Sequence, residues 1–226
     1  MGGIMKRVAI IILALLVCAC TPAFATTQSI EFSPGGDKAG FWYYDGAGSM
    51  SFYQGITVDR AIGSVTDTLV GSSVCIPTLT IGEGPIGSYR IKPLDHSVLT
   101  IRGADSTVYL KATLTAGDLV PVGTTGVAYT GFTADLTDVR ITQAGKALNS
   151  RILNNIANLG TVTLDFALSL QGATGAKYTS LADMLSGGYT GRGGFSGAIT
   201  VPEPATIALL GFGSLALLRK RRRNMK

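Results

Sequence analysis

Alternating apolar and polar positions are the clearest pattern in the middle of this chain. Between Thr161 and Leu170 every second position is apolar: Val162, Leu164, Phe166, Leu168 and Leu170. Successive side chains of a strand point to opposite faces, so this pattern predicts a strand with one face on a core and the other in water. Val108 to Leu114 alternates in the same way. It is expected to form a hairpin with Val98 to Arg102 through the polar turn 103–106.

Further short strands are predicted between turns rich in glycine. The candidates are Ser29–Ser33, Phe41–Tyr44, Ser49–Tyr53, Val74–Ile81, Ser88–Ile91 and Val139–Thr142.

One helix is predicted over Lys146 to Leu159, where apolar residues recur at helical spacing and Gly160 can end the helix. A last helical turn is predicted over 181–185. Many short strands with one short helix favour a mainly β fold, a single β-sandwich, of which a jelly roll is one version.

The last 26 residues combine three features without a gap. They open with Val201, Pro202, Glu203, Pro204 and Ala205. The two prolines keep this stretch out of the helical region, which predicts an extended backbone that a processing enzyme can grip. An uncharged run over 205–218 predicts a short transmembrane helix, because fourteen helical residues span about 21 Å against a bilayer core of about 30 Å. A membrane stop follows: Arg219, Lys220, Arg221, Arg222 and Arg223.

The order of Pro-Glu-Pro triplet, apolar helix and basic cluster resembles the PEP-CTERM sorting signal. The resemblance covers Val201 to Arg223. It implies an exported protein that is held transiently in the membrane and processed by exosortase, a membrane-embedded protease. It also implies an association with exopolysaccharide and biofilm formation. An ordinary C-terminal transmembrane tail is the alternative interpretation, and in either case the resemblance leaves the activity of the body open.

The first 25 residues have the order of a secretory signal peptide. Lys6 and Arg7 precede an apolar run over 8–17, and Ala23-Phe24-Ala25 is a small-x-small cleavage site. Cleavage after Ala25 would place the mature N-terminus at Thr26 and makes the secretion machinery a partner. The segment from Val17 to Cys20 is a loose lipoprotein-processing site, so lipidation of Cys20 is the alternative.

These signals divide the chain into four predicted parts: a signal peptide over 1–25, a β-sandwich domain over 26–185, a glycine-rich flexible linker over 186–200, and the sorting signal over 201–226. Eight of the 19 basic residues lie in the two terminal signals, against one of the 14 acidic residues. The net charge of +5 therefore comes from the two terminal targeting signals. The near-neutral body gives no support for a nucleic-acid partner.

The body contains few groups from which an active site could be built. His96 is its only histidine and Cys75 its only cysteine, so a nucleophilic triad, a zinc site and a disulfide framework are not predicted. Cys75 is expected to be a buried small residue, with a reactive thiol as the alternative. Nothing places the body's two glutamates, Glu31 and Glu83, together as a glycosidase pair. The sequence predicts no catalytic residue, no metal and no cofactor.

An aspartate pair and an aromatic stretch are the remaining candidate sites in the body. Asp135 and Asp138 are interpreted as the solvated edge of a loop rather than as calcium ligands. The aromatic stretch Phe41-Trp42-Tyr43-Tyr44, with Phe52 and Tyr53, is expected to place one pair of rings in the core and another on the sheet surface. The leading hypothesis is a non-enzymatic surface or matrix protein, structural or adhesive. The alternatives are a carbohydrate-binding module, marked by an exposed aromatic strip, and a polysaccharide-acting enzyme, marked by converging carboxylates.

Overall fold

The computed structural model describes residues 28–34, 41–53, 55–62, 65–84, 88–94, 98–122, 129–171 and 181–201. Strands dominate these residues. In chain order they are β1 (Gln28–Pro34), β2 (Trp42–Tyr44), β3 (Ser49–Phe52), β4 (Ile56–Ala61), β5 (Ser73–Cys75), β6 (Leu79–Glu83), β7 (Tyr89–Pro93), β8 (Val98–Arg102), β9 (Val108–Leu114), β10 (Gly117–Val122), β11 (Tyr129–Ile141), β12 (Leu164–Leu170), β13 (Gly191–Gly193) and β14 (Phe195–Val201). The helices are α2 (Gln143–Ala147), α3 (Arg151–Leu159) and α4 (Leu181–Ser186).

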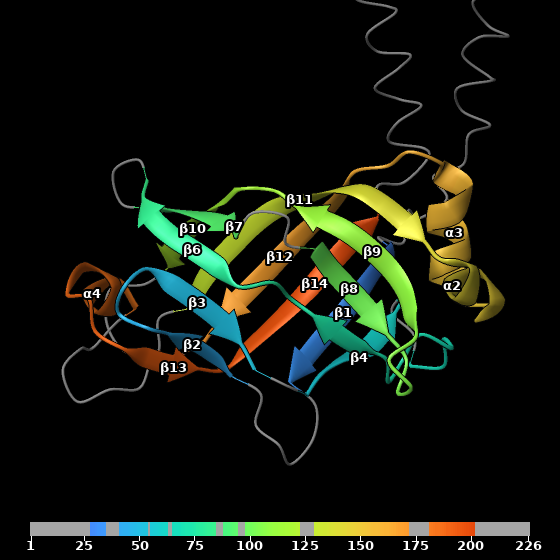
Figure 1. The fold of residues 1–226 in the computed structure, drawn as a ribbon, viewed down its shortest axis with the longest axis horizontal. Coiled ribbons are helices and arrows are strands. Elements are labelled where there is room, and N and C mark those ends of the chain that lie inside the picture. The colour runs from blue at the N-terminus through green and yellow to red at the C-terminus, as the bar shows by residue number, and fades with distance from the viewer. Residues whose placement is uncertain are drawn as a thin grey trace, which may run out of the picture.

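Eight of the described strands form a closed antiparallel barrel (Figure 1). Hydrogen bonding runs through β12, β14, β1, β4, β5, β8, β9 and β11, and β11 pairs with β12 from Thr130 to Leu136, which closes the ring. The prediction of a single β-sandwich, jelly roll included, is therefore wrong, because a sandwich consists of two separate sheets packed face to face. Inward and outward side chains alternate in both architectures, so the sequence pattern could not distinguish them.

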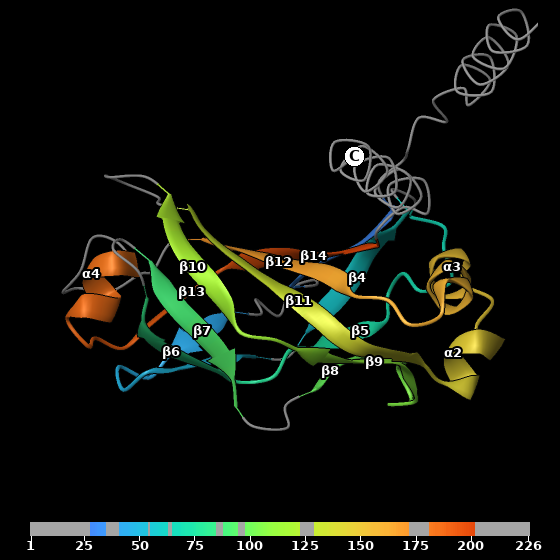
Figure 2. The same cartoon turned by 90° about the horizontal axis from the view of Figure 1, so that it is seen from above.

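The long strand β11 joins the barrel to a second group of strands. One of its edges pairs with β12, and the other pairs first with β10 and then with β9. From β10 the sheet continues through β7, β6, β3, β2 and β13 and curls away from the barrel strands (Figure 2). After β13 the chain passes through Gly194 into β14, so it returns from the edge of this second sheet to the barrel.

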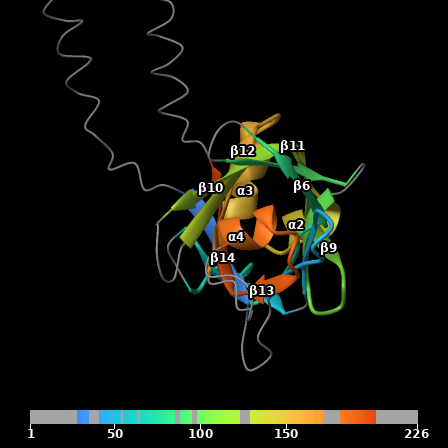
Figure 3. The same ribbon diagram turned by 90° about the vertical axis from the view of Figure 1, so that its left-hand side faces the viewer.

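Apolar side chains fill the interior, and short helices lie at the two ends. Of the predicted inward residues, Leu164, Phe166, Leu168 and Leu170 are buried in β12, whereas Val162 precedes the strand and is half-buried. The helices α2 and α3 lie at one end of the long axis and α4 at the other (Figure 1). Seen along that axis, the helices fall within the ring of strands (Figure 3). Buried residues of both ends, including Ile152 and Met184, belong to the same core as the strands.

The single helix predicted over Lys146 to Leu159 is two helices in the structure. Asn149 has a φ of 57°, which ends α2, and Ser150 is the N-cap of α3, with its side chain accepting a hydrogen bond from the backbone N–H of Leu153. Gly160 ends α3 with a φ of 71°, as predicted. The predicted helical turn over 181–185 is present as α4.

Two segments expected to lack regular structure are strands. The segment 186–200, predicted as a flexible linker from its glycines, contains β13 and most of β14, and β14 pairs on both edges inside the barrel. Asp135 and Asp138 lie within β11 rather than in a loop, and Asp138 occupies the irregular stretch of the β9–β11 pairing with a φ of 50°. In both cases pairing with neighbouring strands overrides a weak local preference.

Candidate functional site

The end of β14 fixes where the predicted sorting motif begins. Val201 is the last residue of β14; it is 2 % exposed and pairs with Gln28 at the start of β1. The Nδ2 of Asn155 in α3 donates a hydrogen bond to Oε1 of Gln28 at 2.9 Å. The start of β1, the end of β14 and α3 therefore meet at one end of the barrel. The predicted sorting motif opens at Val201 and therefore overlaps the last residue of β14.

Most of the predicted targeting residues lie outside the described residues. This holds for Ala23, Ala25 and Thr26 of the leader, for Pro202, Glu203, Pro204 and Ala205 of the motif, and for the membrane stop 219–223. The predicted transmembrane helix over 205–218 and His96 also fall outside them. Among the helices that the structure describes, none has the length and apolar character needed to cross a membrane.

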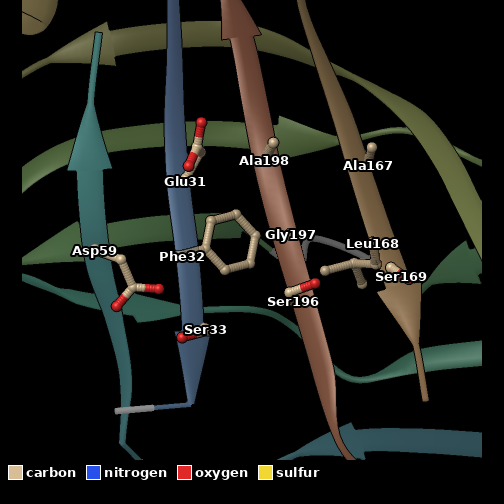
Figure 4. Close-up of a pocket in the computed structure, with 10 residues that line it drawn as sticks. All are labelled: Glu31, Phe32, Ser33, Asp59, Ala167, Leu168, Ser169, Ser196, Gly197 and Ala198. Carbon is tan, nitrogen blue, oxygen red and sulfur yellow. The ribbon is translucent and has the colours of Figure 1, made fainter. Parts of the chain in front are cut away.

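A shallow groove of about 400 Å³ runs over the outer face of β4, β1, β14 and β12 (Figure 4). Small side chains line its middle, because Ala198 pairs with Ala167 and Ser196 pairs with Ser169 across β14 and β12. Two carboxylates, those of Glu31 and Asp59, lie on the β1 and β4 side and do not point toward one another (Figure 4). The groove therefore lacks the converging acid pair that glycoside hydrolysis requires.

The two glutamates considered as a glycosidase pair are not brought together by strand pairing. Glu31 and Glu83 belong to β1 and β6, which do not pair. Within the described ranges, no three or more His, Cys, Asp or Glu side chains are grouped so that they could hold a metal ion. What the structure brings together is instead a set of aromatic rings.

Phe41, Tyr43 and Tyr53 form a surface cluster, called here the aromatic cluster. The rings of Phe41 and Tyr53 are stacked with centroids 5.0 Å apart and 23° between their planes. Tyr43 meets Tyr53 edge-on at 6.2 Å and 78°. The guanidinium of Arg192 on β13 lies 5.6 Å from the Phe41 ring centroid, within cation–π range. Tyr53 is 47 % exposed, so the cluster is open to solvent.

The opposite face of the same strands anchors the cluster. Trp42 and Tyr44 are buried, and Nε1 of Trp42 donates a hydrogen bond to the Gly194 carbonyl at 3.0 Å. The expectation that one pair of rings fills the core while the other covers the surface is confirmed. Strand alternation in β2 produces this division directly.

A tight turn sets the register of β2 and β3 under the cluster. Oδ1 of Asp45 accepts hydrogen bonds from the backbone N–H groups of Ala47 at 2.7 Å and Ser49 at 2.9 Å. These bonds, the one from Ser49 foremost, hold the pKa of the Asp45 carboxyl below its usual value of 3.8. Gly46 and Gly48 supply the positive φ angles of the turn, 78° and 105°.

Next to Tyr53 the surface is hollowed into a cavity of about 400 Å³, called here the Tyr53 cavity. It lies between the β3–β4 connection and strands β5 and β8, and its lining includes Tyr53, Ile56, Ser73, Cys75, Arg102 and Ser106. Nε of Arg102 donates to Oγ1 of Thr100 at 3.0 Å, which fixes the guanidinium at the cavity wall. Cys75 is exposed here, so its predicted burial is wrong: β5 turns Val74 inward and both of its neighbours outward.

The comparisons with known proteins identify the tail and match no part of the body. Residues 200–223 match the PEP-CTERM protein-sorting motif. This confirms the resemblance and shows that the chain carries the signal of an exported protein that passes through the membrane and is processed by exosortase. No curated protein and no solved structure matches the chain.

Proposed function

We propose that the protein is a non-enzymatic cell-surface or extracellular-matrix protein with a structural or adhesive role in an exopolysaccharide or biofilm setting. The secretion machinery exports it, and an exosortase-like membrane protease trims its tail. The observation that carries this proposal is the match over 200–223, which begins at the last two residues of a barrel strand. The sorting signal therefore begins where the barrel ends.

The position of Val201 sets where trimming can occur. Val201 is buried and paired, so cleavage at or before it would remove part of a strand that hydrogen-bonds to both β1 and β12. Three residues separate Val201 from the apolar run, and they span about 10 Å at most. Before cleavage, the barrel end that contains Gln28 and α3 is therefore held close to the membrane. We expect the cut to fall after Val201.

The experiment follows tagged protein in membrane, cell-surface and medium fractions of a host with and without its exosortase. The parent should be trimmed and released only when exosortase is present. Replacing Pro202 and Pro204 with Ala should leave the protein uncut in the membrane, because Ala allows a helix to extend through Glu203 and hide the extended segment. Trimming of this double variant at the parental rate would contradict recognition of the motif.

A second variant separates recognition from retention. Replacing Arg219, Lys220, Arg221, Arg222 and Arg223 with Gln should weaken retention at the inner face before cutting, and leave the Pro-Glu-Pro segment unchanged. Intact-mass analysis of the released parent then fixes both ends. The expected termini are Thr26 and a residue beyond Val201; an acylated Cys20 would instead establish the lipoprotein alternative.

A further inference from the structure

We propose that the aromatic cluster and the adjoining Tyr53 cavity form one binding site for a saccharide chain. The cluster offers flat apolar surface on the solvent side of β2 and β3, and the cavity offers a polar-walled hollow beside it. Tyr53 belongs to both. The proposal does not depend on how the tail is processed.

The rings of the cluster suit the flat face of a pyranose. One face of many pyranose rings carries only C–H groups, and stacking it on an aromatic face removes apolar surface of both partners from water. Phe41 and Tyr53 stack on each other, and Tyr43 meets Tyr53 edge-on, so the ring surface that a sugar can contact is the exposed part of Tyr53, which is 47 % exposed. The buried Trp42 and Tyr44 anchor β2 from the core side, so little backbone freedom of this strand is lost on binding.

Polar residues flank Tyr43 in the neighbouring strands. Tyr43 pairs with Arg192 on one side and with Ser51 on the other, and Ser51 Oγ lies 3.5 Å from Oγ1 of Thr78. Sugar hydroxyls both donate and accept hydrogen bonds, and the Ser, Thr and Tyr hydroxyls of this face can do the same. A face built from rings bordered by hydroxyls fits a saccharide better than a purely apolar ligand.

The Tyr53 cavity extends the site beyond a single sugar ring. Its volume of about 400 Å³ lies within the range of about 300–1,000 Å³ typical of small-molecule sites. Its walls combine the apolar side chain of Ile56 with the hydroxyls of Ser73 and Ser106 and the guanidinium of Arg102. The ligand class that uses both the rings and this hollow is an oligosaccharide, with one unit stacked on the cluster and the next in the cavity.

The groove of Figure 4 serves as an internal contrast. It has a similar volume, yet its outward-facing residues are small side chains and carboxylates, and its one aromatic residue, Phe32, is 1 % exposed. It lacks a ring surface on which a sugar could stack. Saccharide binding is therefore assigned to the cluster and its cavity.

The test is calorimetric titration of the full chain in a detergent without a sugar headgroup. The probes are hexasaccharides of β-1,4-linked glucose, of N-acetylglucosamine and of galacturonic acid. At least one is expected to bind, and Tyr53→Ala should weaken that binding about tenfold, corresponding to the loss of one stacked ring. Tyr53→Phe keeps the ring and should bind within about threefold of the parent.

Two further variants complete the design. Val120→Ala removes a side chain of similar exposure, 48 %, from β10, which lies several strands away from β2, and it should leave binding unchanged. Arg102→Gln should weaken binding, most strongly for the galacturonic acid chain, and unchanged binding of this variant would exclude the cavity from the site. Thermal melting confirms that each variant is folded. The proposal is overturned if none of the three hexasaccharides binds, or if Tyr53→Ala binds as tightly as the parent.

Discussion

Close packing around Gly197 shows how single residues hold the barrel wall together. Gly197 of β14 pairs with Phe32 of β1, whose ring stacks on Phe166 at 6.0 Å. A Cβ at position 197 would lie 2.3 Å from Cζ of Phe32 and 2.7 Å from Cδ2 of Leu168. Position 197 therefore has no room for a side chain unless its neighbours move.

The first prediction is that Gly197→Ala destabilises the barrel. Relieving the clash requires Phe32 to leave its position, and overpacking of this kind costs about 1–3 kcal/mol. Chemical denaturation of the purified protein measures the change. Gly131→Ala is the matched control, because Gly131 also lies in a strand and a Cβ there meets nothing within 4 Å. Equal stabilities of the two variants would show that β14 does not pack as described.

The second prediction concerns Leu164, which is fully buried at the start of β12. Leu164→Asp places a carboxyl without a partner in the core, with an expected cost of several kcal/mol. The variant should melt far below the parent or fail to fold. Asp165→Asn, at the exposed neighbouring position, should melt close to the parent. If Leu164→Asp melts like the parent, the register of β12 is wrong.

At the scale of elements, the turn between β2 and β3 contributes a pH-dependent part of the stability. The same two strands carry the aromatic cluster. The pKa of Asp45 is lowered by backbone N–H groups, foremost that of Ser49. A carboxyl whose folded pKa lies below its unfolded value stabilises the fold above the unfolded value, near 3.8, and this contribution disappears as the pH falls through the lower folded pKa.

The third prediction follows from the lowered pKa of Asp45. Asp45→Asn should be less stable than the parent at pH 6, and the difference in free energy of unfolding should shrink as the pH falls from about 4 toward 2. Urea denaturation of both proteins across this range measures it. A difference that stays constant with pH would mean that the charge of Asp45 does not support the turn.

At the scale of the whole molecule, β14 closes the barrel and also leads into the sorting motif. Its two edges pair with β1 and β12, so the ring exists only when this last described strand is in place. The chain order has a consequence for export. The barrel can be completed only after nearly all of the body has crossed the membrane, just before the membrane-held tail.

The fourth prediction tests this closure by truncation. A chain ending at Val201 should keep the barrel, whereas a chain ending at Gly194 leaves β1 and β12 each with one unpaired edge and should lose cooperative unfolding. Thermal unfolding followed by circular dichroism, together with amide exchange in β1, distinguishes the two. A cooperative transition in the shorter chain would mean that β14 is dispensable.

Particular residues show how far the sequence could predict this protein. Local signals were sufficient for the alternation of β12, the hairpin of β8 and β9, the positive φ of Gly160 and the division of rings in β2. They missed β4, β10, β13, β14 and most of β11. In β11 and β14, Gly131, Asp135 and Gly197 lower the local strand preference, and pairing with neighbouring strands overrides it. They also gave no sign that Cys75 is exposed beside Tyr53.

The sequence by itself determined the sorting signal of the protein and its mainly β character. The sorting motif over 200–223 is read from contiguous residues, and alternation is a property of neighbours along the chain. Only the tertiary structure decided that the strands close into a barrel, that the glycine-rich segment is its last strand, and that Phe41, Tyr43 and Tyr53 gather beside a cavity. These features depend on pairing between distant segments, and single-strand periodicity carries no information about which strands become partners.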